Sequence, residues 1–174
     1  MKFKSLFLLL ASATLVLFTV LYVKGNGSND DANADVSLEI VQSIDISKSK
    51  DMNFGQITLG SSGGELTLGT DGVLATTGGI EIFDDANTEP AEFTVSGESN
   101  ALYTVTLPSD NEVKITGVNN SSEEIDLKTF SHNSTEELDA QGAETFQVGA
   151  IAEIDASNEV DVYQGDFTVS VDYQ

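Results

Sequence analysis

The chain has 174 residues, and 40% of them are apolar, which is enough to build one packed domain without help from a metal or a disulfide. It carries 29 acidic residues against seven lysines and no arginine, for a formal net charge of -22. Such a surface repels nucleic acid and anionic lipid, since binding to either needs a basic face. The absence of cysteine excludes thiol catalysis, thiolate zinc sites and a disulfide framework.

The amino terminus has the pattern of an export signal. Two lysines precede an uncharged apolar stretch, residues 5–23, of the kind found in secretory signals. This stretch is also long enough to cross a bilayer as a helix, so cleavage after Ala32-Asn33-Ala34 and retention as a membrane anchor both stay open. We predict that residues 1–34 are a signal peptide or an N-terminal anchor helix with a short polar spacer. Both outcomes export residues 35–174 to the periplasm, the cell surface or the medium.

The body, residues 35–174, has the pattern of strands separated by turns. Apolar and polar residues alternate with a period of two, and no stretch shows a sustained helical stripe. The expected strands lie near residues 36–46, 57–59, 65–68, 80–83, 93–95, 103–107, 113–115, 125–130, 146–154 and 167–173. Roughly nine or ten short strands with Gly-, Asn- and Asp-rich turns between them predict a single all-β domain, an antiparallel β-sandwich.

The first of these segments places its apolar residues on one face. The residues that share this parity are Val36, Leu38, Ile40, Ile44 and Ile46. Gln42 is the single polar interruption. Two interpretations fit the pattern: an ordinary first strand that buries these five side chains in its own domain, or a donor strand that pairs with a sheet edge of another subunit.

Few catalytic arrangements can be built from this composition. His132 is the only histidine, and its neighbours are those of an exposed polar turn. The Gly-x-Ser-x-Gly motif is also absent, so we predict that the protein is not an enzyme. Oxygen ligands are in excess, and one acidic loop carries them at alternating positions, as a calcium loop does. The candidate Ca²⁺ ligands are Asp155, Ser157, Glu159 and Asp161; the competing interpretation is a solvated acidic turn, and no other cofactor is expected.

Several segments, in order, are similar to a family of exported bacterial proteins, the domain of unknown function 4402. These segments are Asp51-Met-Asn-Phe-Gly55, Pro90-Ala-Glu-Phe-Thr-Val-Ser-Gly97, Tyr103-Thr-Val-Thr-Leu-Pro108, Leu138-Asp-Ala-Gln-Gly142, Phe146-Gln-Val-Gly-Ala150 and Tyr163-Gln-Gly-Asp-Phe-Thr-Val-Ser-Val-Asp-Tyr173. The resemblance spans nearly all of residues 45–174. It implies an immunoglobulin-like sandwich and no assigned activity. By fold analogy, the closing segment also looks like the last strand of spore-coat and chaperone-usher pilin subunits.

These features favour a structural or binding role at the cell surface. The first hypothesis is a pilin-like or coat-like subunit that assembles with itself or with other envelope proteins through strand edges. The alternative is a monomeric sandwich, held at the envelope, that adheres or binds a ligand such as Ca²⁺. Neither involves nucleic acid. Contact with a membrane is expected only through residues 5–23, if the leader is retained.

Overall fold

The computed structural model describes residues 31–174, and most of the predicted signal or anchor segment lies outside this range. The chain divides into a unit that ends at Leu38 and a body that runs from Glu39 to Gln174. Residues 31–38 have no regular secondary structure. No helix in the described part of the chain could span a membrane.

The body consists of β-strands that pair antiparallel, which confirms the all-β prediction. Within residues 31–174 these are β1 (Asp45–Lys50), β2 (Gln56–Leu59), β3 (Gly64–Leu68), β4 (Leu74–Thr76), β5 (Ile80–Asp84), β6 (Ala91–Ser96), β7 (Tyr103–Thr106), β8 (Val113–Gly117), β9 (Glu124–His132), β10 (Ala143–Ile154), β11 (Tyr163–Gln164) and β12 (Ser170–Tyr173). The large sheet has the order β1-β6-β10-β9-β8-β11, with β3 and β4 joined to it through β10. Two small sheets, β12-β7 and β2-β5, complete the fold.

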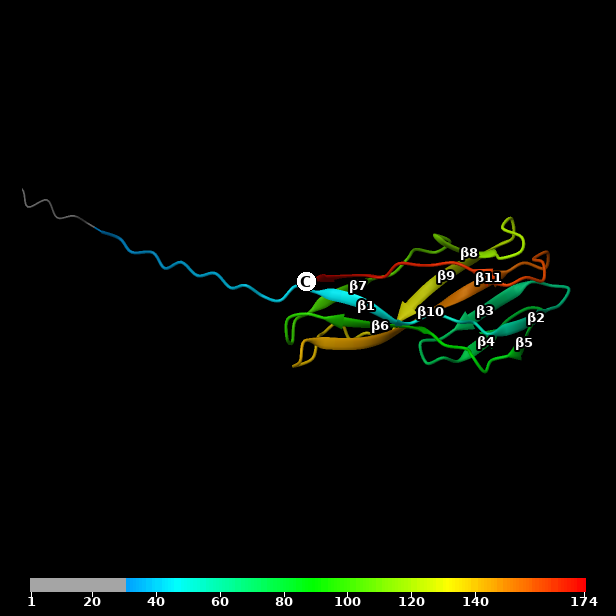
Figure 1. Cartoon of the computed structure of the whole chain (residues 1–174), viewed down its shortest axis with the longest axis horizontal. Helices are drawn as coiled ribbons and strands as arrows, with labels where there is room; N and C mark the ends of the chain where they lie inside the picture. Colours follow the sequence, from blue (N-terminus) through cyan, green and yellow to red (C-terminus); the bar gives the residue numbers. More distant parts are fainter. Residues whose placement is uncertain (1–30) are drawn as a thin grey trace, which may run out of the picture. The chain divides into compact units, whose positions relative to one another are not determined.

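β10 is the longest strand and lies in the middle of the large sheet (Figure 1). One side of β10 pairs with β9. The other side pairs first with β6, through residues 143–148, and then with β3, through residues 150–154. Gly149 lies where β10 changes partner, and a Cβ atom there would come within 2.3 Å of the Leu68 carbonyl oxygen. Glycine at this position therefore lets the backbones approach closely enough for β10 to serve both partners.

Two hydrophobic clusters lie between the large sheet and the small sheets. Phe146 and Val148 of β10 belong to the first cluster, which β7 and β12 cover. Ala152 and Ile154 of the same strand belong to the second cluster, which β2 and β5 cover. The even-numbered residues of one strand thus supply both cores. Phe130 of β9 and Phe167, which lies between β11 and β12, pack against both clusters and join them.

A β-bulge at Thr129 changes which residues of β9 face the core. Ile125 and Leu127 are buried at odd positions, whereas beyond the bulge Phe130 packs inward at an even position. Thr129 has a φ of 51°, an unusual value for a β-branched residue, and the register with β10 shifts at this point. Its N–H donates to Asp110 Oδ1 at 2.6 Å. The bulge lets β9 stay paired to β10, whose own alternation is continuous.

The amino-terminal strand differs from the sequence prediction. The alternating pattern predicts a strand over residues 36–46, but β1 begins only at Asp45, and residues 31–44 have no regular secondary structure. The reason is the length of the partner: β6 ends at Ser96, which lies opposite Asp45. The prediction also missed the short strands β4 and β11. Three and two residues are too few to establish a period of two.

Replacing Phe146 by Ala tests the central position of β10. Phe146 is fully buried, and its ring centroid lies 5.9 Å from that of Phe93. We expect the substitution to lower the free energy of unfolding by about 3–5 kcal/mol, measured by urea denaturation. The matched control is Phe83→Ala, because Phe83 is 72% exposed. A control change beyond about 0.5 kcal/mol, or equal losses in both variants, would contradict this account of the core.

Candidate functional site

The structure divides the five predicted strand-edge residues into two groups. Val36, Leu38 and Ile40 are exposed, at 94%, 85% and 88% of their surface. Ile44 and Ile46 are half-buried and pack against the first hydrophobic cluster. Only the last two therefore behave as residues of an ordinary first strand. The alternating pattern continues into a segment whose apolar side chains face solvent.

Gln42 anchors the chain at the point where it enters the body. Its N–H donates to Glu98 Oε2 at 3.0 Å, and its carbonyl oxygen accepts a hydrogen bond from Tyr173 Oη at 2.9 Å. The N–H of Glu98 donates in turn to Tyr173 Oη at 2.6 Å. Gly97 makes room for this hydroxyl, since a Cβ at Gly97 would lie 2.2 Å from it. The backbone is thus fixed at Gln42, directly after the exposed segment.

Asp161, a predicted Ca²⁺ ligand, holds two loops together. Its carboxylate accepts hydrogen bonds from the N–H groups of Asn119, Asn120 and Val162 at 2.7–2.9 Å. The Asn119 side chain donates a further bond at 2.6 Å. Desolvation opposes ionisation of Asp161, but these bonds outweigh it, so the pKa of the carboxyl lies below its ordinary value. The carboxylate thereby joins the β10–β11 loop to the β8–β9 turn.

The other predicted ligands, Asp155, Ser157 and Glu159, are exposed. No group of three or more Asp, Glu or His side chains within residues 31–174 is placed to hold a metal ion. The donors that surround Asp161 also compete with any cation for its oxygens. The geometry of this loop therefore gives the Ca²⁺ hypothesis no support, and it stays a prediction from the sequence.

A second carboxylate, Glu144 on β10, lies at the centre of a polar network at the edge of the first cluster. It accepts hydrogen bonds from the buried Tyr103 hydroxyl, from Ser134 Oγ at 3.0 Å, and from the N–H and hydroxyl of Thr135 at 2.6 and 3.0 Å. Partial burial opposes ionisation of Glu144, yet the hydrogen bonds outweigh it and lower its pKa. Burial, together with the bond to Glu144, raises the pKa of Tyr103. The network fixes the loop after β9 against β7 and β10.

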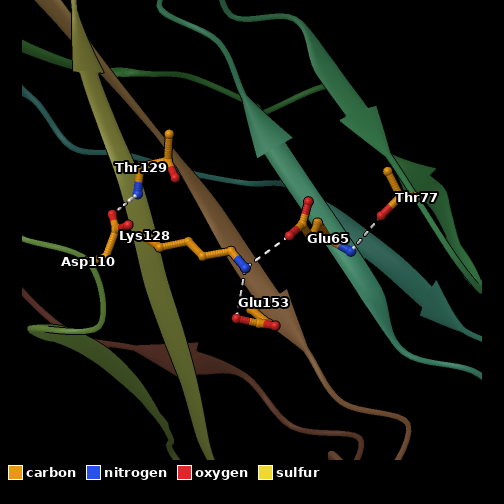
Figure 2. Close-up of polar contacts among 6 residues, drawn as sticks. All are labelled: Glu65, Thr77, Asp110, Lys128, Thr129 and Glu153. Atoms are coloured by element: carbon orange, nitrogen blue, oxygen red, sulfur yellow. Dashed lines mark hydrogen bonds and ion pairs between the residues drawn. The ribbon is translucent and has the colours of Figure 1, made fainter.

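All four lysines of the described chain are paired with carboxylates. Figure 2 shows Lys128 of β9 between Glu65 of β3, at 2.9 Å, and Glu153 of β10, at 2.8 Å. Hydrogen bonds to these two carboxylates raise the pKa of Lys128. The remaining pairs are Lys48 with Asp51, Lys50 with Glu89, and Lys114 with Glu124 and Asp126. Because 27 of the 29 acidic residues follow residue 34, most surface carboxylates have no cationic partner.

The described surface offers no deep pocket for a small ligand. One open hollow, of about 350 Å³, lies between the glycine-rich loops at residues 58–62 and 78–81, and another, of about 580 Å³, lies beside Lys50 and Asn87. Neither is lined by an aromatic or histidine side chain. His132 was expected in an exposed turn, which is wrong. It ends β9, half-buried, with its ring 6.0 Å from that of Phe146.

The fold and its surface define an acidic all-β domain with an exposed apolar segment before its first strand. The chain belongs to the family described as domain of unknown function DUF4402, whose model matches residues 44–173. This match confirms the resemblance seen in the sequence and covers β1 to β12. It begins at Ile44, so Val36, Leu38 and Ile40 lie outside it. Comparisons with curated proteins and with solved structures gave no match.

Glu144→Gln tests the polar network through its pH dependence. Because the folded-state pKa of Glu144 lies below its ordinary value of 4.5, the ionised group stabilises the fold above that pH, and this contribution is lost as the pH falls through the folded-state pKa. At neutral pH we expect the variant to lose about 1–3 kcal/mol of unfolding free energy. The difference from wild type should shrink in acid. Glu81→Gln on β5 is the exposed control, and a wild-type advantage that is independent of pH would contradict the assignment.

The acidic excess predicts that salt stabilises the fold. Screening shortens the range of charge repulsion from about 30 Å at 0.01 M to about 3 Å at 1 M ionic strength, so Tm should rise with NaCl. Differential scanning calorimetry measures this directly. A Tm that stays flat over this range would show that repulsion among the carboxylates does not limit stability. A larger rise in CaCl₂ than in MgCl₂ at the same ionic strength would support the Ca²⁺ hypothesis.

Proposed function

We propose that this protein is an exported, non-catalytic structural subunit of the cell surface, pilin-like or coat-like, that assembles through β-strand pairing. The observation that carries the proposal is the exposed alternating segment with Val36, Leu38 and Ile40, which directly precedes an anchored strand. Such a segment can complete a sheet edge of another subunit while its apolar side chains leave water.

The energetics favour weak contacts that become effective at high local concentration. Full burial of each of the three apolar side chains is worth about 1.5–3 kcal/mol. Ordering the backbone of the segment costs about 1–2 kcal/mol per residue, and hydrogen bonds to the sheet edge offset part of this cost. The net affinity of one contact is therefore small. Subunits concentrated at a surface gain most from contacts of this kind.

The alternative, a monomeric adhesive or ligand-binding domain, has less support from the described surface. Its hollows are open, and no aromatic side chain lines either one. Sites for small ligands are usually enclosed and largely apolar. The exposed Val36, Leu38 and Ile40 would also have no role in a monomer, although they expose apolar surface at a cost in solubility.

A shortened chain tests whether the segment drives assembly. The body from Ile44 onward contains every buried apolar residue of residues 31–174, so chains beginning at Asp35 and at Ile44 are both expected to fold. In sedimentation velocity we expect the longer chain to form oligomers as its concentration rises, and the shorter chain to remain monomeric. Their unfolding free energies should agree within about 1 kcal/mol.

Two point variants of the longer chain provide the matched control. Ile40→Asp places a charge among the apolar positions of the alternating segment, and Ser37→Asp places the same charge among its polar positions. Only the first should abolish the oligomers. If the unmodified chain from Asp35 stays monomeric at high concentration, and its amide protons before Gln42 exchange without protection, the assembly proposal is wrong and the monomeric alternative takes its place.

A further inference from the structure

The strand β11 leaves one edge of the large sheet open. It pairs with β8 on one side, and it is the last strand in the sheet order within residues 31–174. Val118 N–H donates to the carbonyl oxygen of Val162 at 2.8 Å, and the register places Tyr163 opposite Gly117. Because bonded pairs alternate along an antiparallel ladder, the backbone N–H and C=O of Tyr163 point away from β8. They face the open edge, where another strand can bond to them.

An apolar patch lies beside this open edge. Val160 is fully exposed, and Val118 and Val162 are 58% and 59% exposed. Tyr163 packs against the second hydrophobic cluster, so the adjacent Val162 points to the outer face of the sheet, where Val118 lies opposite it. We call Val118, Val160 and Val162 the valine patch.

Asp161 holds the valine patch in place. It turns its carboxylate toward the β8–β9 turn and binds the N–H groups of Asn119 and Asn120, while Val160 and Val162 on either side of it face water. The polar residue is thus directed inward and its apolar neighbours outward. A surface fixed in this way loses little conformational entropy when it binds a partner.

Other open edges fit a partner strand less well. On β1, Lys48 lies opposite the buried Phe93 and is followed by a register shift, and a lysine with a bulge protects an edge strand from pairing. On β5, the exposed residues Ile82 and Phe83 are consecutive, so they point to opposite faces. An alternating apolar segment matches the valine patch, in which Val118 and Val162 lie opposite each other on one face and Val160 is exposed beside them.

The chain length decides which segment can reach the patch. Gln42 bonds to Glu98, just beyond Ser96, and Ser96 lies opposite the first residue of β10. The valine patch lies beyond the last residue of β10, in the β8–β9 turn and the β10–β11 loop; Figure 1 shows β1 and the β8–β9 turn at opposite ends of the body. The twelve residues of β10 span about 36 Å. The seven residues 35–41 reach at most about 25 Å, so in a chain that begins at Asp35 they cannot cover their own patch.

We infer that the open edge of β11 and the valine patch of one subunit bind the segment with Val36, Leu38 and Ile40 of a second copy. This inference rests on the proposed function and names its acceptor. The donor segment and the acceptor edge lie on different surfaces, so the contact is heterologous, and repetition builds a head-to-tail chain of subunits. The three apolar side chains of the donor pack on the valine patch, and its backbone bonds to that of Tyr163.

Charge makes this contact dependent on salt. Asp35 and Glu39 of the donor segment approach Glu159 and Asp166 near the acceptor edge, and no lysine of the described chain is free to compensate. Like charges at these separations repel, and ions screen them. The association constant should therefore rise between about 0.05 and 1 M NaCl.

Single charges placed on the two surfaces test the acceptor. In the chain from Asp35, Val162→Asp is expected to lower the association constant about tenfold or more, measured by sedimentation equilibrium. The matched control is Phe83→Asp, which adds the same charge to an exposed apolar residue on the competing edge of β5, and it should leave association unchanged. Circular dichroism and the unfolding midpoint verify that both variants remain folded.

Mixing two defective chains tests the head-to-tail arrangement. Ile40→Asp lacks a working donor and Val162→Asp lacks a working acceptor, so each alone should be monomeric. Together they should form one-to-one dimers that do not grow, because only one intact donor and one intact acceptor remain.

The outcomes separate this inference from the proposed function. If Ile40→Asp abolishes assembly while Val162→Asp does not, subunits assemble through the segment but at another edge, and the inference is wrong. If Phe83→Asp is the only acceptor variant that loses assembly, the acceptor edge is β5 and not β11. A wild-type chain from Asp35 that never associates, in low or high salt, overturns the inference and the proposed function together.

Discussion

The continuous alternation of β10 is the constraint on which the rest of the structure depends. Its even-numbered residues face inward along all twelve positions, so a single strand supplies side chains to both hydrophobic clusters. The neighbouring strands adapt to it. β9 needs a bulge at Thr129 to remain paired, and β6 and β3 meet at Gly149, where no side chain fits. The length of β10 also sets the distance between the anchored Gln42 and the valine patch, which excludes pairing within one copy of a chain that begins at Asp35.

Most of the fold could be predicted from the sequence because strand alternation is a local signal. The period of two predicts the segments around Phe93, Tyr103 and Phe146, and each belongs to a strand. Which strand pairs with which is not a local property of the sequence. The residues from Val36 to Ile40 alternate as a strand does, yet β6 has no residues opposite them. A pattern shows what a segment is able to do, whereas the partner strand determines where β1 begins.

The candidate site was less accessible to sequence reasoning, since it depends on contacts between distant parts of the chain. Asp161 was interpreted as a metal ligand because of its alternating acidic neighbours. Its hydrogen-bond partners, the backbone N–H groups of Asn119 and Asn120, are some 40 positions away in the sequence. The sequence alone does not single out Val160 and Val162, because apolar residues that alternate with acidic ones in a loop predict no particular structure. Their exposure, together with the inward-turned Asp161, shows that these two valines face water.

The carboxyl-terminal segment has a consequence for the timing of folding. Residues 163–173 contribute β11 to the large sheet and β12 to a small one, and between them Phe167 packs against both clusters. Its partners β7 and β8 lie far back in the chain, so neither core closes until this segment has paired with them. Closing these distant contacts carries a cost in loop entropy, so the body is expected to fold slowly for its size.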